Sequence, residues 1–258
     1  MQFWEKFSSL KEAFDYLDEN IDSTGKNLPT ININSIEKHN FIFKLKSTIY
    51  LLKQDRFFFK TLIKKPLFYI YKILRSFLKS KSYIENNNIF LFNLKNLKSI
   101  DKYIQDKSYQ IIWGFSYCQK PVNCPKKRFS SECIYDVNNP VCKNCYICKC
   151  ANLIHKDDKF LVIPDVKYIG KELIKIHNDN KKICFVISSC DLSIKMNSDF
   201  ANMLNIKGMG IKLSGRTCVN FKSFLYAEKG IKSAMTDLTS DLKKVLTDLI
   251  KARLVSKI

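Results

Sequence analysis

Apolar residues in the second half of the chain fall into short, nearly continuous runs that alternate with segments of helical spacing. The runs cover residues 109–117, 159–163, 182–188 and 210–213. Runs of this length are typical of strands that are buried on both faces, as in parallel sheets. Residues 166–177 and 198–204 have helical spacing, and a helical tail is expected from residue 221 to the end. The alternation predicts an α/β fold with an open, mostly parallel sheet.

The first 80 residues have helical spacing throughout most of their length. Residues 3–17 predict a short helix, and a polar linker follows it. Residues 40–80 carry apolar and aromatic stripes, and Pro66 should end one helix and let another begin. We therefore divide the chain into an N-terminal basic helical extension, residues 1–80, and a cysteine-rich α/β domain, residues 81–258.

The chain has a formal charge of +20, with 44 lysine or arginine residues against 24 acidic ones. Such a surplus attracts nucleic acid or anionic lipid. Only five of the basic residues are arginine, whereas proteins that read nucleic acid depend on the forked donors of arginine. The abundance of lysine, asparagine and isoleucine is what AT-rich coding DNA produces without selection for binding. The composition therefore disfavours nucleic acid as a partner.

Residues 40–80 are aromatic and strongly basic, with ten lysine or arginine residues against one acid, Asp55. Basic amphipathic helices of this kind can lie on an anionic membrane. Alternatively, they cover one edge of the core and turn their lysines to water. An anionic membrane surface is thus one candidate partner of this segment, and packing alone is the other interpretation.

The sequence predicts a cytoplasmic protein, either free or peripheral to a membrane. No apolar run approaches the roughly 20 residues that span a bilayer. The first residues also lack the charged region, apolar core and cleavage site of a signal peptide. In the cytosol, ten cysteines are expected to be reduced ligands or reactive thiols and not a disulfide framework.

Seven of the ten cysteines lie between residues 118 and 150. Cys142, Cys145 and Cys148 form a C-x-x-C-x-x-C run, a spacing that lets sulfur atoms converge on one zinc ion or iron–sulfur cluster. Cys150 follows after a single residue, so its participation in the same centre would be strained. His155 is the one histidine near enough to be considered. We expect an all-thiolate centre and favour a four-iron, four-sulfur cluster over zinc.

The fourth ligand can come from the rest of the segment or from the sheet. Cys118, Cys190 and Cys218 each follow the end of a predicted strand, and ligands collect beyond the carboxyl ends of parallel strands. We expect these three thiols to share one edge of the sheet, whereas Cys184 lies inside a strand as a buried apolar residue. The candidate metal ligands are Cys118, Cys124, Cys142, Cys145, Cys148, Cys190 and Cys218.

Cys190 also has a separate interpretation as a catalytic residue. It precedes Asp191 at a strand end, where helix-terminal amides lower the pKa of a thiol. Cys190 and Asp191 are therefore candidate catalytic residues, with Cys218 as a partner thiol. The alternative is that Cys190 and Cys218 are further ligands or small packing residues.

The motifs also occur in a recognisable order. They are paired asparagines within residues 82–88, Cys118 and Cys124-Pro125, the Cys142–Cys145–Cys148 run, Cys190-Asp191-Leu192 at a strand end, and Gly210 and Cys218 before a helix. Over roughly residues 65–230 this order resembles the prokaryotic cysteine-rich family catalogued as domain of unknown function 116. The resemblance implies no defined activity. Hydrophobic N-terminal segments in some members imply membrane association for residues 40–80.

The chain departs from that family at several positions. Tyr146 stands where the family tends to have glycine after the middle cysteine of the run. Cys133, Cys150 and Cys184 look additional, so the resemblance implies that these three are not ligands.

Three hypotheses follow from the sequence. The first is a metal- or iron–sulfur-binding protein with a multi-cysteine site at the sheet edge. The second is a thiol-dependent enzyme that uses Cys190, with a structural metal in the C-x-x-C-x-x-C run. The third is a non-catalytic, zinc-stabilised adaptor at a membrane surface.

Overall fold

A computed structural model describes residues 38–54, 56–78, 83–178, 182–215, 217–232 and 235–257. Over this part the chain is an α/β protein with a mostly parallel sheet, which confirms the predicted fold class. The helix expected over residues 3–17 lies outside the described residues. None of the described helices is long and apolar enough to cross a bilayer.

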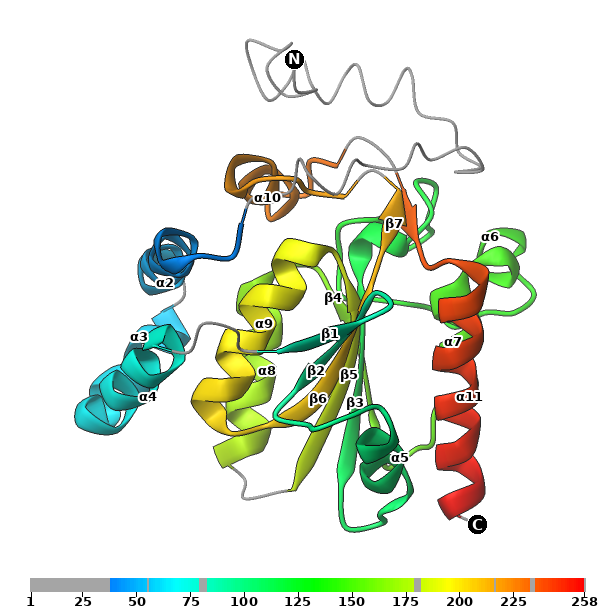
Figure 1. Cartoon of the computed structure of the whole chain (residues 1–258). Coiled ribbons are helices and arrows are strands. Elements are labelled where there is room, and N and C mark those ends of the chain that lie inside the picture. The colour runs from blue at the N-terminus through cyan, green and yellow to red at the C-terminus, as the bar shows by residue number, and fades with distance from the viewer. Residues whose placement is uncertain are drawn as a thin grey trace, which may run out of the picture.

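A six-stranded sheet forms the centre of the molecule, in the order β1-β2-β6-β5-β3-β4 (Figure 1). The strands are β1 (Ile84–Asn86), β2 (Ile89–Phe92), β3 (Gln110–Ser116), β4 (Lys159–Ile163), β5 (Ile183–Ser189) and β6 (Lys207–Lys212). The last four pair in parallel, and β1 and β2 add an antiparallel hairpin beside β6. The runs that predicted β3, β4 and β5 match within one residue, whereas β6 begins three residues before the expected position 210.

The direction of the parallel connections reverses between β3 and β5. From β3 the chain passes to β4 on one side, returns beyond β3 to β5, and continues outward to β6. In doubly wound sheets such a reversal opens a crevice at the carboxyl ends of the two central strands, and ligands bind there. Residues that follow Ser116 and Ser189 flank this crevice.

Helices cover both faces of the sheet and bury two separate apolar cores (Figure 1). On one face lie α8 (Val166–Asn178) and α9 (Asp191–Leu204), and on the other lie α5 (Lys98–Gln105) and α11 (Ser240–Lys257). Successive side chains of β3 and β5 point to opposite faces of the sheet, and both faces are buried. The sequences of these strands are therefore apolar almost without interruption.

The helix expected over residues 198–204 begins seven residues earlier, at Asp191. Polar side chains in this helix form hydrogen bonds within the helix: Asn197 donates to the Ser193 carbonyl at 2.8 Å. The first turn can lie close to the sheet because Gly210 has no side chain. A Cβ atom at position 210 would come within 2.8 Å of the Ile194 side chain in that turn.

The expected continuous helix from residue 221 to the end is wrong. Instead, α10 (Phe221–Ala227) is followed by a turn in which Gly230 has a φ of 86°. A two-residue strand, β8 (Thr236–Asp237), then pairs with β7 (Ser214–Gly215), and α11 begins after it. A positive φ strains residues with a side chain, so glycine at position 230 permits the break.

Between residue 38 and the sheet, the described residues form three helices: α2 (Phe41–Gln54), α3 (Arg56–Lys64) and α4 (Pro66–Leu78). The helix restarts at Pro66, as the sequence predicted. Tyr69 of α4 joins the core between α8, α9 and the sheet, and Phe43 of α2 is buried against residues that follow β5. The helices therefore pack against the α8–α9 side of the molecule (Figure 1).

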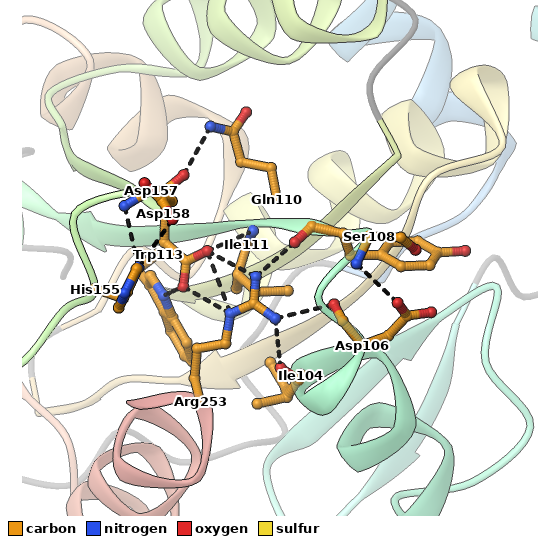
Figure 2. Close-up of polar contacts among 11 residues, drawn as sticks. Ile104, Asp106, Ser108, Gln110, Ile111, Trp113, His155, Asp157, Asp158 and Arg253 are labelled. Carbon is orange, nitrogen blue, oxygen red and sulfur yellow. Dashed lines mark hydrogen bonds and ion pairs between the residues drawn. The ribbon is translucent and has the colours of Figure 1, made fainter. Parts of the chain in front are cut away.

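A buried ion pair fixes α11 to the amino-terminal side of the sheet (Figure 2). The guanidinium of Arg253 contacts the carboxylate of Asp158 at 3.0 Å, and both side chains are almost fully buried. Arg253 also donates to the carbonyls of Ile104 at 2.8 Å and Asp106 at 3.0 Å. Trp113 of β3 donates its indole N–H to Asp158 at 3.4 Å. The network joins α5, β3, the β4 entry and α11 through one arginine.

Candidate thiol sites

All ten cysteines are free thiols, and the structure sorts most of them into two groups. The loop group lines one cavity and consists of Cys124, Cys133, Cys142, Cys145 and Cys148. The edge group lines another cavity and consists of Cys118, Cys190 and Cys218. The two cavities share no lining residue. The candidate ligands predicted from the sequence are therefore brought together in two places and not in one.

Two short helices present the thiols of the C-x-x-C-x-x-C run. They are α6 (Pro140–Asn144) and α7 (Tyr146–Ala151). Asn139 caps α6 by accepting from the backbone N–H of Cys142 at 3.3 Å, and Pro140 supplies a preset φ at the first helical position. Cys145 lies between the two helices, so three thiols at three-residue spacing face the same cavity.

The remaining two loop thiols come from the irregular segment before α6. Lys120 organises this segment from inside, since it is only 2% exposed. Its ammonium donates to the carbonyls of Lys127 at 2.6 Å and Glu132 at 3.0 Å, and to the Ser130 hydroxyl at 2.9 Å. It also hydrogen-bonds the Cys124 thiol. The hydrogen bonds of Lys120 thus hold the segment before α6 in a bend around the thiols.

Burial and mutual proximity keep the loop thiols protonated. Burial, followed by the neighbouring thiols, raises the pKa of Cys148 to about 11. The same causes raise the pKa values of Cys142 and Cys145. In the described part of the chain, no three histidine, cysteine, aspartate or glutamate side chains already stand where they could hold a metal ion. The sulfur atoms therefore surround the cavity, of about 10 Å³, without meeting at one point.

The cysteines outside the two groups have other surroundings. Cys150 hydrogen-bonds the Tyr146 hydroxyl, and burial raises its pKa to about 12. Cys184 is completely buried within β5. His155 forms an ion pair with Asp157 at 3.6 Å and lines neither cavity.

The last helix, α11, packs against Tyr146 of α7, the helix that carries Cys148 of the loop group. The Tyr146 hydroxyl donates to the Lys243 carbonyl at 2.9 Å and lies 3.1 Å from the Thr247 hydroxyl. The ammonium of Lys243 also stands over the Tyr146 ring at 5.4 Å. Because Arg253 fixes the other end of α11, the wall of the loop group is held by contacts at both ends of this helix.

The edge group surrounds the crevice between β3 and β5. Cys118 lies in the 3₁₀ turn Tyr117–Gln119 directly after β3, and Cys190 is the N-cap residue of α9 directly after β5. Cys218 lies between the short strand β7, which follows β6, and the helix α10. All three thiols line a cavity of about 30 Å³. The expectation that they share an edge is confirmed.

Two of the edge thiols lie close together beside a buried cation. Cys218 is near enough to Cys190 to shift its pKa, and the Cys218 thiol donates to the Ser223 carbonyl at 3.7 Å. The ammonium of Lys232, 5% exposed, donates to the Cys218 sulfur at 3.6 Å. On the other side, the Ser193 hydroxyl lies 3.2 Å from the Cys190 sulfur.

These contacts separate the acidities of the pair. The hydrogen bond from Cys218 lowers the pKa of Cys190 to about 6, with further lowering by Lys232 and Ser193 and an opposing effect of burial. The same hydrogen bond, followed by burial, holds the pKa of Cys218 well above its usual range. The negative charge of the pair therefore rests on Cys190.

A buried carboxyl group shares this cavity. Glu228, at the end of α10, accepts the backbone N–H of Val166 at 3.0 Å. Burial holds its pKa well above the usual range, against the lowering effect of the Val166 hydrogen bond. The cavity thus holds a thiol that favours its anion and a carboxyl group that favours its protonated form.

Asp191 lies outside the cavity. Its carboxylate forms ion pairs with Lys195, one turn along α9, and with Lys212 at the end of β6 at 3.5 Å. It does not line the space that holds the three thiols. The structure therefore separates the two candidate catalytic residues, and Asp191 ties the first turn of α9 to the sheet.

Sequence reasoning missed the charged partners of both groups. Lys120 and Lys232 are two among the many lysines, so composition and spacing do not single them out. Glu228 lies 62 residues from its partner Val166. Lys120 follows a turn whose residues Tyr117, Cys118 and Gln119 are all buried, but this burial is known only from the structure.

Comparisons with protein-family models, with curated proteins and with solved structures found no match. The resemblance to the domain of unknown function 116 therefore stays a prediction.

Proposed function

We propose that the loop group is a metal centre with four thiolate ligands: Cys124, Cys142, Cys145 and Cys148. The observation that carries this proposal is the gathering of five thiols around one small cavity beside a buried lysine. Crowded thiols favour a divalent cation, because each thiolate raises the pKa of its neighbours until positive charge is added. Binding would draw the sulfur atoms inward toward one point. Cys133 is a fifth thiol within reach.

The size of the cavity favours zinc over the iron–sulfur cluster that the sequence suggested. A volume of about 10 Å³ has room for roughly one atom-sized guest. Zinc sites with four thiolates place sulfur about 2.3 Å from a single ion, whereas a four-iron core would need the loop to move outward. When bound, zinc supplies a crosslink between the segment before α6 and the α6–α7 pair.

Lys120 supports the same assignment from the protein side. A centre with four thiolates and one divalent cation has a net charge of about −2, and a buried charge needs a partner. The Lys120 ammonium already contacts Cys124 and holds three groups of the surrounding segment. It would offset part of the negative charge and keep the segment folded around the ion.

Metal analysis after anaerobic purification tests the proposal. We expect one zinc ion per chain, without the broad visible absorption of an iron–sulfur cluster. Cys142→Ser and Cys148→Ser should each lose the ion. Cys150→Ser is the matched control, since Cys150 belongs to the same helix as Cys148 but lies outside the cavity. Iron with inorganic sulfide would replace zinc as the assignment, and a metal-free native protein would refute both.

We also propose that α2–α4 attach the protein to an anionic membrane surface. Of the 17 large hydrophobic side chains that are exposed in the described residues, 12 lie between Phe41 and Leu78. Leu67 and Leu78 are the most exposed of them, at 84% and 87%. Lys64, at the end of α3, and Lys65, just before α4, are also exposed, so this segment presents basic as well as apolar groups to solvent.

Vesicle flotation tests the membrane proposal. Binding to phosphatidylserine vesicles should exceed binding to phosphatidylcholine vesicles and should weaken as salt is raised, since salt screens exposed charges. Leu67→Ser with Leu78→Ser should reduce binding. Val255→Ser, at an exposed apolar position on α11, should not. Equal binding of both variants would remove α2–α4 as the contact surface.

A further inference from the structure

The edge group has the ingredients of a reactive site that is independent of the loop centre. Its cavity lies where the strand order reverses, between the ends of β3 and β5, which is where α/β sheets of this topology bind ligands. Three thiols and a buried carboxyl group line it, and the buried Lys232 ammonium contacts Cys218 beside it. Neither cluster of thiols needs the other to be complete.

Cys190 is placed as a nucleophile. It is the N-cap residue of α9, at the positive end of the helix dipole, and its sulfur lies 3.2 Å from the Ser193 hydroxyl. Cys218 contacts the same sulfur from the other side, and Lys232 backs Cys218 at 3.6 Å. A thiolate at Cys190 is stabilised by each of these neighbours, in keeping with its lowered pKa.

Glu228 is placed as a proton donor for a leaving group. Its carboxyl group lines the cavity that Cys190 lines, and one of its oxygens is held by the Val166 amide at 3.0 Å. A nucleophile that favours its anion and an acid that keeps its proton, side by side, form the pairing that general acid catalysis needs. Ser116 and Asn197 add polar groups to the same wall.

The volume of the cavity selects the substrate class. A pocket for a cofactor or a drug-sized ligand occupies several hundred Å³, whereas this one has about 30 Å³. One water-sized guest needs roughly 10–15 Å³, so the space beside the thiols takes a group of a few atoms, while the open side of the cavity admits the rest of a larger molecule. The smallest electrophile of that size that a thiolate attacks is the O–O unit of a hydroperoxide.

We infer that the edge group reduces hydroperoxides, with Cys190 as the attacking thiolate, Cys218 as the resolving thiol and Glu228 as the acid. The Cys190 sulfur attacks one peroxide oxygen, the O–O bond breaks, and the leaving oxygen takes the proton of Glu228 to leave as water or alcohol. Cys190 is then a sulfenic acid. Cys218 attacks that sulfur, a disulfide forms, and the hydroxyl leaves as water with the Cys218 proton. Two electrons pass from the thiol pair to the peroxide, and an external thiol restores the pair.

The test uses reduced full-length protein and equimolar hydrogen peroxide. We expect loss of two hydrogen atoms in the intact mass, and peptide mapping should find the Cys190–Cys218 disulfide. In Cys218→Ser the sulfenic acid should accumulate at Cys190 and react with a dicarbonyl trap. Cys190→Ser should abolish the reaction. Cys184→Ala, at a thiol within β5 that lines neither cavity, is the control and should leave the disulfide unchanged.

Glu228→Gln tests the proton donor. Glutamine keeps the Val166 hydrogen bond but has no acidic proton, so the rate constant for peroxide should fall by roughly 100-fold. The alkylation rate of Cys190 by iodoacetamide, which needs no acid at this position, should stay within a few-fold. An unchanged peroxide rate would remove Glu228 from the mechanism.

Two results would overturn the inference as a whole. One is oxidation of the loop thiols before the edge thiols at equimolar peroxide. The other is a metal ion that Cys142→Ser retains and Cys190→Ser loses, because the edge thiols would then be ligands. Metal content of the wild-type protein is measured separately, so failure here is distinguishable from failure of the loop centre.

Discussion

The loop group and the edge group use the same building blocks, cysteines and one buried lysine, and yet their chemistry differs. In the loop group, Lys120 donates mainly to backbone carbonyls. The ionisable neighbours of Cys142, Cys145 and Cys148 there are mainly other thiols, and burial and this crowding raise their pKa values. In the edge group, Lys232 donates to a sulfur atom. A thiol–thiol hydrogen bond then places the negative charge on one residue.

The difference teaches that the placement of hydrogen-bond donors, more than the number of thiols, decides what a cysteine cluster can do. Crowded thiols without nearby donors gain most from a metal cation. A pair with a cation, a serine and a helix N-terminus around it gains a thiolate without any metal. The predictions that follow probe this contrast.

The largest effect is expected from removal of a loop ligand. Cys148→Ser should lose the metal and much of the stability of the α6–α7 segment, because the binding energy of structural zinc, on the order of 10 kcal/mol in small zinc domains, is folding energy. Thermal unfolding with and without chelator measures it. Cys150→Ser should keep the chelator dependence of the wild type. Equal chelator sensitivity of both variants would contradict the assignment of Cys148.

The next effect is the difference in thiol reactivity. Alkylation of Cys190 should rise with pH to half its maximum near pH 6, the pKa set by Cys218, Lys232 and Ser193. In metal-free protein Cys148, with a pKa of about 11, should have a roughly ten-thousand-fold smaller thiolate fraction than Cys190 at neutral pH and react far more slowly. Mass-resolved alkylation of each peptide measures both residues in one sample.

Lys232→Met provides the control for this reactivity profile. Loss of the ammonium should move the Cys190 profile to higher pH and leave the rate at alkaline pH nearly unchanged. Glu228 and Asp165 also face Cys190 or its neighbours, and their charges would raise its pKa. A profile that stays in place in Lys232→Met would show that the ammonium does not act on Cys190.

The third effect separates the two groups through α11. Arg253→Met leaves Asp158 buried without its cation and should lower the free energy of unfolding by about 3–5 kcal/mol. Because α11 contacts the loop group through Tyr146, metal retention during mild heating should fall. Cys190 alkylation at moderate temperature should change much less. Denaturant unfolding and metal release measure the two outcomes.

The double variant Arg253→Met with Asp158→Asn is the matched comparison. Removing both charges should recover part of the lost stability, since no unpaired ion stays buried. If the double variant is as unstable as the single one, packing of the arginine stem and not the charge explains the loss.

The smallest effect is expected from the cap of α6. Asn139→Ala removes the side-chain acceptor of the Cys142 and Val141 amides, which typically lowers stability by about 1 kcal/mol. Metal affinity should weaken by a few-fold, and the edge group should not respond. Asn144→Ala, at the other end of α6, should change metal affinity less.

The strands of the sheet could be predicted because burial on both faces forces continuous apolar runs. The edge site followed from the same reasoning, since Cys118 and Cys190 come directly after β3 and β5. The start of α9 was missed because Ser193 and Asn197 are polar, and their bonds within the helix are visible only in three dimensions. The break at Gly230 had a local signal, a glycine within the expected helix.

The partners of the thiols could not be predicted. Glu228 caps the end of α10 and lines the edge cavity, and Lys232 contacts Cys218 from the turn that follows, whereas pattern analysis assigned both residues to one long helix. Their roles depend on burial, which tertiary packing determines. The division of the cysteines into two groups also needed the structure, because one C-x-x-C-x-x-C run and three strand ends are compatible with a single shared centre.

Gly210 has a consequence for how such a site is recognised in other sequences. The missing side chain lets Ile194 and the first turn of α9 settle onto β6, and that turn carries Cys190. The distance between the two edge sulfurs thus depends on a position with no sulfur, eight residues before Cys218. A search pattern written in cysteines alone would accept chains whose helix stands too far from the sheet. A pattern that also requires glycine at this position selects chains in which α9 can lie close to β6.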